Sequence, residues 1–116
     1  MLVLVLALVI QDPAAEVAAE LTTHATPRPL SAEAVTEESP GFLGAHRRPF
    51  TDERPLLKKW PEQGPKLLWE RRTGGGYAAP AIVKGRLILF HRLAGQEIVD
   101  CLDPKTGKRL WRQAAQ

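Results

Sequence analysis

Apolar residues gather in two parts of this chain, at its extreme N-terminus and after residue 66. Residues 2–10, LVLVLALVI, form one unbroken apolar run. After residue 66, short apolar runs alternate with turn-forming residues, which is the pattern of β-strands joined by hairpins. The pattern therefore predicts a small β domain preceded by a segment of a different kind.

Four successive strands are predicted from residue 80 onward. Lys84-Gly85 and Ala94-Gly95 separate the first three, because an X-Gly pair between apolar runs marks a tight hairpin. A Pro-Lys-Thr-Gly turn joins the last two. A further short strand, KLLWERR, precedes the four and ends at a run of three glycines. The four strands are PAIVK (80–84), RLILFHRL (86–93), EIVDCLD (97–103) and KRLWRQ (108–113).

The apolar residues of these strands are consecutive rather than alternating, as at Leu87 to Phe90 and Ile98-Val99. Such runs place apolar side chains on both faces of the sheet, so both faces should be covered. A lone four-stranded sheet cannot cover its own two faces. We therefore predict an all-β fold with a single four-stranded antiparallel sheet that stacks between like neighbours, as a propeller blade does.

Residues 1–19 are predicted to be a signal peptide. The nine-residue apolar run is too short to cross a bilayer as a helix, but it has the length of a signal-peptide core. Val17-Ala18-Ala19 supplies small residues for cleavage after Ala19. No Lys or Arg precedes the run, so a buried strand or a short core helix is the alternative. Export would make the protein periplasmic or extracellular. Its only expected contact with a membrane is through the export signal.

Residues 20–55 are predicted to be an irregular linker. Thr22 to Ser39 is rich in Thr, Pro, Ser, Ala and Glu without periodicity, and residues 40–65 contain five prolines. Leu56-Leu57 and Trp60 are the expected anchors of this Pro-rich stretch. Residues 56–116 would then be the lead-in and the first blade of the propeller.

Charge divides the chain at the same place as hydrophobicity. The net charge is −5 before residue 47 and +8 from there on, which gives the total of +3. The bases of the second part are scattered over strand ends and turns, where solubility and edge protection explain them, so no nucleic-acid partner is predicted. Trp60, Trp69 and Trp111 lie in apolar contexts, which favours core positions over base-stacking platforms.

Residues 101–111, CLDPKTGKRLW, contain a Thr-Gly-Lys that invites a phosphate-binding interpretation. A Walker A loop requires Gly five residues before its Gly-Lys pair and Ser or Thr after the Lys. Leu102 and Arg109 occupy these positions, so the loop is excluded. A hairpin turn explains the stretch better, with Asp103 capping backbone N–H groups and Gly107 in the left-handed conformation.

The other candidate sites also favour structural roles. Residues 74–79, GGGYAA, match G-x-G-x-x-A, but a strand follows instead of the helix that a dinucleotide site needs, so a flexible loop is predicted. No histidine has a metal-ligand spacing to another or to Cys101. His91 is expected to be a satisfied strand residue and Cys101 a small buried one. No catalytic, cofactor-binding or metal site is predicted.

The turn and its flanking strands resemble a known repeat. They are similar to the PQQ-like β-propeller repeat proteins, which share their fold with quinoprotein alcohol dehydrogenases and BamB-like outer-membrane assembly factors. The family repeat reads roughly Ala-x-Asp-x-x-Thr-Gly-Lys-x-x-Trp. Residues 56–70 resemble the lead-in of secreted bacterial members, and the resemblance covers residues 56–113. With Cys in place of Ala, the matching residues are Cys101, Asp103, Thr106, Gly107, Lys108 and Trp111.

The resemblance implies a scaffold role for these six residues, with Trp111 packed between neighbouring blades against the turn of the adjacent repeat. A propeller has about 4–8 blades of roughly 40 residues. This chain has room for one, so we expect a truncated first blade with Trp111 exposed. The implied function is that of an exported, non-catalytic protein-binding or assembly scaffold without a cofactor, whose partners are other blades or a protein.

An enzyme is the second hypothesis that the resemblance implies. The chain would then be the N-terminal part of a PQQ-dependent dehydrogenase, with PQQ and calcium as cofactors. Its calcium site would need acidic and Asn side chains. The sequence contains no Asn and no vicinal Cys pair, so such a site would have to lie in other blades.

Overall fold

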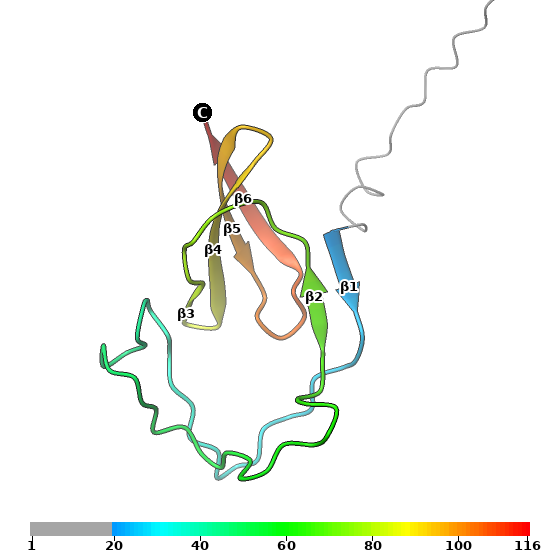
Figure 1. Cartoon of the computed structure of the whole chain (residues 1–116), viewed down its shortest axis with the longest axis vertical. Coiled ribbons are helices and arrows are strands. Elements are labelled where there is room, and N and C mark those ends of the chain that lie inside the picture. Colours follow the sequence, from blue (N-terminus) through cyan, green and yellow to red (C-terminus); the bar gives the residue numbers. More distant parts are fainter. Residues whose placement is uncertain (1–19) are drawn as a thin grey trace, which may run out of the picture.

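The computed structural model describes residues 20–116, and the predicted signal peptide lies outside the described residues. The described part is all-β, as predicted, and has two antiparallel sheets (Figure 1). One sheet has the order β1-β2 and the other the order β3-β4-β5-β6. The strands are β1 (Leu21–Thr23), β2 (Trp69–Arg71), β3 (Ala81–Val83), β4 (Arg86–Leu93), β5 (Gln96–Leu102) and β6 (Arg109–Ala115).

The four-stranded sheet is an up-and-down meander, which confirms the four predicted strands and their order. Its first two hairpins are two-residue turns at Lys84-Gly85, with φ of 49° and 68°, and at Ala94-Gly95, with φ of 50° and 80°. Positive φ at both central residues defines the type I′ turn, whose twist matches that of the paired strands. Tight strand pairing therefore holds Lys84 and Ala94 in a conformation that non-glycine residues seldom adopt.

The turn between β5 and β6 also forms as predicted. The Asp103 N–H donates to the Lys108 carbonyl, and the Gly107 N–H donates to the Asp103 carbonyl, both at 2.8 Å. The Asp103 carboxylate accepts from the Lys105 N–H at 2.8 Å. Gly107 has φ of 70°, the left-handed conformation expected of it. Residues 103–108 are called the β5–β6 turn below.

The core of the four-stranded sheet is small and lies on β4 and β5. Ile98 and Leu102 are buried on one face together with the polar residues His91 and Asp100. Cys101 is buried as predicted, on the opposite face, because successive side chains of a strand alternate. The burial of two polar residues beside so few apolar ones means that hydrogen bonds must share in holding this core together.

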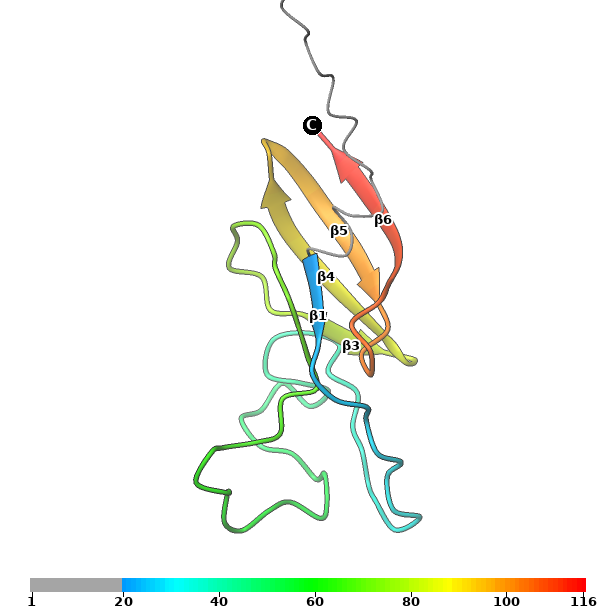
Figure 2. The same cartoon turned by 90° about the vertical axis from the view of Figure 1, so that its right-hand side faces the viewer.

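The β1–β2 sheet lies against one broad face of the four-stranded sheet (Figures 1 and 2). Leu21 pairs with Arg71, and Thr23 pairs with Trp69. The sequence predicted the strand in β2 but placed β1 within the linker. Three residues carry no readable periodicity, and β1 forms because β2 supplies hydrogen-bond partners from far along the chain.

The stretch between β1 and β2 is irregular, and it extends beyond one end of the sheet (Figure 1). Backbone bridges tie it down, between Val35 and Arg54 and between Ser39 and Ile82 of β3. The predicted anchors are wrong, because Leu56, Leu57 and Trp60 are all more than half exposed. Backbone pairing, rather than apolar packing, fixes the course of this stretch.

Candidate functional site, a tryptophan docked on a turn

Trp69 of β2 is seated on the β5–β6 turn. Its indole N–H donates to the carbonyl of Pro104 at 3.0 Å. A Cβ added to Gly107 would lie 2.5 Å from the Trp69 ring, so the ring rests directly on the glycine. The hydrogen bond and the ring contact together dock the two-stranded sheet onto the four-stranded sheet.

Arg71, two residues further along β2, forms a second link to the same turn. Its side chain is only 3% exposed and forms an ion pair with Glu20 at 3.0 Å. The guanidinium also donates from Nε to the carbonyl of Gly107 at 3.2 Å. The Glu20 carboxylate accepts from Arg109 of β6 at 3.1 Å and lies 3.7 Å from Arg112. Because three guanidinium groups surround one carboxylate, Glu20 ties β1 and β2 to β6.

The face of the four-stranded sheet that β1 and β2 cover contains a buried ionic network centred on Asp100. Its side chain is 1% exposed and receives two parallel hydrogen bonds from Arg112, each at 2.8 Å. His91 completes the set at 2.9 Å from the same carboxylate. Burial alone would raise the pKa of Asp100, but the hydrogen bonds from Arg112 and His91 outweigh it and leave the pKa below its ordinary value. The same pairing raises the pKa of Arg112.

The tautomer of His91 follows from its two partners. Its Nδ1 accepts from the Gly74 N–H at 2.8 Å, so the proton must be on Nε2, which then donates to Asp100. His91 is therefore the satisfied strand histidine that the sequence predicts. A Cβ on Gly74 would lie 1.9 Å from the carbonyl oxygen of Arg92, so this position requires glycine. The glycine run is bonded to β4 through Gly75 and Arg92, and it leads into a strand rather than into the helix that a dinucleotide site needs.

The opposite face of the four-stranded sheet is open in this chain. Trp111 of β6 is 49% exposed and Phe90 of β4 is 44% exposed. The strand register places Trp111 beside Cys101 and Phe90 beside Val99, so these side chains share the face that β1 and β2 do not cover. The expectation that both faces are covered is met on one side only. Trp111 is thus exposed, as expected for a truncated blade, whereas Trp60 is 59% exposed, contrary to the expectation of a core position.

Trp69 and Trp111 occupy similar local sequences 42 residues apart. Lys-Leu-Leu-Trp at residues 66–69 returns as Lys-Arg-Leu-Trp at residues 108–111. Sequence reasoning missed the role of Trp69, although this recurrence was the signal that could have found it. A spacing of about 40 residues is that of one propeller blade.

The six residues of the sequence motif do not form one site. Asp103, Thr106 and Gly107 build the β5–β6 turn, in which the Thr106 hydroxyl accepts from the Lys108 N–H at 3.4 Å. Lys108 itself is exposed. Cys101 and Trp111 are directly paired across β5 and β6, on the open face. The motif thus spans the β5–β6 turn, on which Trp69 packs, and the strand β6, which carries the exposed Trp111.

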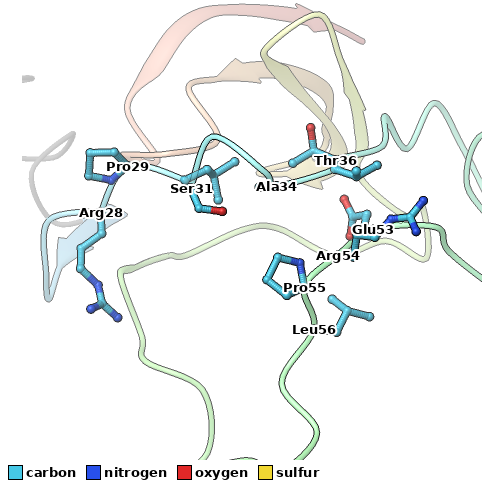
Figure 3. A pocket seen from close by; sticks show the side chains of 11 residues that line it. Arg28, Pro29, Ser31, Ala34, Thr36, Glu53, Arg54, Pro55 and Leu56 are labelled. Atoms are coloured by element: carbon cyan, nitrogen blue, oxygen red, sulfur yellow. The ribbon is translucent and has the colours of Figure 1, made fainter.

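A pocket of about 540 Å³ lies away from this docking contact, between residues 28–36 and 53–56 (Figure 3). The side chains that line it include Pro29, Leu30, Pro55 and Leu56, and none of them is His or Cys. The lining also contains the charged side chains of Arg28, Glu53 and Arg54, so the pocket combines an apolar, proline-rich wall with charged groups. Within residues 20–116, one group of metal-ligating side chains lies together, formed by Glu37, His46 and Asp52.

Two further observations bear on identity. Among the described residues, no helix has both the length and the apolar character needed to span a membrane. No family model, no curated protein and no solved structure matches this chain.

Proposed function

We propose that this chain contains the first blade of a PQQ-like β-propeller that works as an exported, non-catalytic scaffold for protein binding or assembly. The observation that carries the proposal is the docking of Trp69 on Pro104 and Gly107. Its local sequence recurs at Trp111, where the side chain is open. One tryptophan therefore contacts a turn within the chain, and a second is available to contact the turn of a following repeat.

The open face supports a stacked neighbour on energetic grounds. Full burial of a large apolar side chain stabilises a protein by about 1.5–3 kcal/mol. Phe90 and Trp111 are each nearly half exposed, so a large part of that stabilisation is unrealised in this chain. A second four-stranded sheet packed here would bury both rings and complete a two-sided blade.

The polar groups of the blade favour a scaffold over an enzyme. The Asp100 carboxylate is fully engaged by Arg112 and His91, and His91 uses both of its ring nitrogens. Glu20 is held by arginines in the same way. Each of these three groups serves to join strands, and none of the three is free to act as a general base for a nucleophile.

Export is part of the same proposal. Cleavage after Ala19 would make Glu20 the first residue of the mature protein. Glu20 is the residue that Arg71 and Arg109 bind, so cleavage would leave the anchor of β1 in place. N-terminal sequencing of the protein recovered from outside the cytoplasm should begin at Glu20, and an uncleaved start at Met1 would contradict export by this signal.

The gene sequence beyond codon 116 provides the test of the propeller. We expect further Asp-x-x-Thr-Gly-x-x-x-Trp repeats at intervals of about 40 residues. Their absence would exclude a propeller. Reduction of a dye by the full-length protein with added PQQ and calcium would instead establish the dehydrogenase hypothesis and overturn the non-catalytic scaffold.

A further inference from the structure

We propose that Glu37, His46 and Asp52 form a zinc site in the irregular stretch between β1 and β2. Each residue offers one ligand atom, and these atoms all lie within 4.8 Å of one another. The His46 Nε2 is 3.3 Å from the Glu37 Oε1. The site is independent of the propeller proposal, since none of its residues belongs to the blade or to the docking contact.

Backbone pairing brings the two carboxylates together. Val35 and Arg54 exchange both of their backbone hydrogen bonds, at 2.8 and 3.0 Å. This bridge sets residues 35–37 antiparallel to residues 52–54, so Glu37 and Asp52 lie side by side although 14 residues separate the segments that carry them. The placement of the two oxygen ligands therefore depends on the backbone and not on chance side-chain contact.

A tight loop delivers the imidazole. The Gly44 N–H donates to the Gly41 carbonyl at 3.0 Å, and the Arg48 N–H donates to the Leu43 carbonyl at 3.1 Å, which folds the chain back toward Glu37. The His46 ring stacks on Phe50, with ring centroids 6.1 Å apart and an angle of 11° between the ring planes. The stack orients the ring that presents Nε2.

The Glu37 carboxylate is already prepared as a ligand. The Thr51 hydroxyl donates to its Oε2 at 2.8 Å, which leaves Oε1 facing His46. This hydrogen bond from Thr51 fixes the orientation of the Glu37 carboxylate, so its Oε1 is held toward the imidazole before any metal binds.

The ligand set suits zinc and disfavours magnesium and calcium. Imidazole nitrogen and carboxylate oxygen bind zinc at about 2.0–2.2 Å, and tetrahedral ligands at that distance lie roughly 3.3–3.5 Å apart. The separation of 3.3 Å between His46 and Glu37 already meets this spacing. Magnesium and calcium prefer oxygen ligands throughout, so the imidazole disfavours them. A fourth position would be left for water.

The chain contains a matched control for this site. His24 and Glu70 form another exposed histidine–carboxylate pair, at 3.1 Å, and that pair is not part of a three-ligand group. If any exposed pair of this kind were enough for zinc, the two would bind alike. The third ligand, Asp52, is what distinguishes the proposed site.

The test is a calorimetric titration of zinc chloride into the full, chelator-treated chain at neutral pH. We expect one zinc per chain, an affinity at least tenfold lower in His46→Ala and in Asp52→Asn, and a change of less than twofold in His24→Ala. Excess magnesium should not compete. Absence of saturable one-to-one binding, or equal losses in His46→Ala and His24→Ala, would overturn the proposal.

Limited trypsin digestion provides a second readout. Arg47 follows His46 directly and is exposed, and the next bond, Arg48–Pro49, is resistant to trypsin. Zinc should therefore slow cleavage after Arg47 several-fold by holding the loop. The protection should persist in His24→Ala and disappear in His46→Ala. Equal cleavage with and without zinc in the unsubstituted chain would contradict a structural site.

Discussion

The indole N–H of Trp69 donates to the carbonyl of Pro104 at 3.0 Å, and this bond joins a strand of one sheet to a turn of the other. The contact is short, directional and backed by the ring packed on Gly107. The β5–β6 turn, whose Thr-Gly-Lys invites comparison with a phosphate-binding loop, therefore serves as the surface on which Trp69 packs. The stability of the fold should depend on this contact more than on any exposed aromatic residue.

Replacing Gly107 with Ala should strongly destabilise the protein. The methyl group would meet the Trp69 ring, and a left-handed alanine costs about 1–2 kcal/mol on its own. We expect the free energy of unfolding to fall by about 2–4 kcal/mol, measured by urea denaturation. Gly85→Ala is the matched control, because Gly85 has φ of 68° and nothing within 4 Å of the added Cβ. Equal losses in the two variants would show that the ring contact contributes nothing.

Asp100 should make the protein sensitive to acid. Its pKa is lower in the folded state than its ordinary value of 3.8, so the folded state favours the ionised carboxylate. That contribution is fully present above the unfolded pKa and is lost as the pH falls through the folded pKa. Urea unfolding between pH 7 and pH 2 should therefore show stability decreasing from about pH 4 downward.

Asp100→Asn should remove part of that acid dependence and should also cost about 2–3 kcal/mol at pH 7, because Arg112 loses its carboxylate partner. Glu37→Gln is the comparison. The pKa of Glu37 is also lowered, but its carboxylate lies in the irregular stretch and not in the buried network of Asp100. An unchanged acid slope in Asp100→Asn would contradict the role assigned to the buried network.

Glu20 should act as the anchor of β1. Its carboxylate pairs with Arg71 and Arg109 and is only partly exposed, so Glu20→Gln should lower the free energy of unfolding by about 1–2 kcal/mol at low ionic strength. The loss should shrink in high salt because exposed charge pairs are screened. Glu97→Gln, at an exposed position on β5, is the control, and a loss as large as that of Glu20→Gln would argue against a specific anchor.

The strands of the four-stranded sheet could be predicted from the sequence because each signal was local. Apolar runs bounded by Lys84-Gly85, Ala94-Gly95 and the turn at Asp103 specify β3 to β6 and their pairing. The strand β1 could not be predicted, because Leu21–Thr23 forms a strand only when a partner 46 or more residues away lies beside it. The ion pairs of Glu20 could not be predicted either, because its arginine partners come from two strands that are distant in the sequence.

The expected apolar anchors failed for a related reason. Leu56 and Trp60 are apolar, but no sequence pattern says which surface would cover them, and the structure leaves them exposed. Trp69 is the opposite case, an aromatic residue that is docked. Its neighbours in the sequence resemble those of Trp111, but only the folded structure shows that its ring packs on Gly107. The only sign of that arrangement in the sequence was the recurrence, 42 residues later, of the Lys-x-Leu-Trp pattern around Trp69.

Hydrogen exchange of the three tryptophan indole N–H groups tests the docking of Trp69 most directly. In an ¹⁵N-labelled sample at neutral pH, the Trp69 signal, assigned with Trp69→Phe, should exchange much more slowly than those of Trp60 and Trp111. This result follows because Trp69 alone among the three has its indole N–H bonded to a carbonyl of the β5–β6 turn within the described residues. A Trp69 signal that exchanges as fast as that of the exposed Trp60 would contradict the docking and the proposed blade, which rests on it.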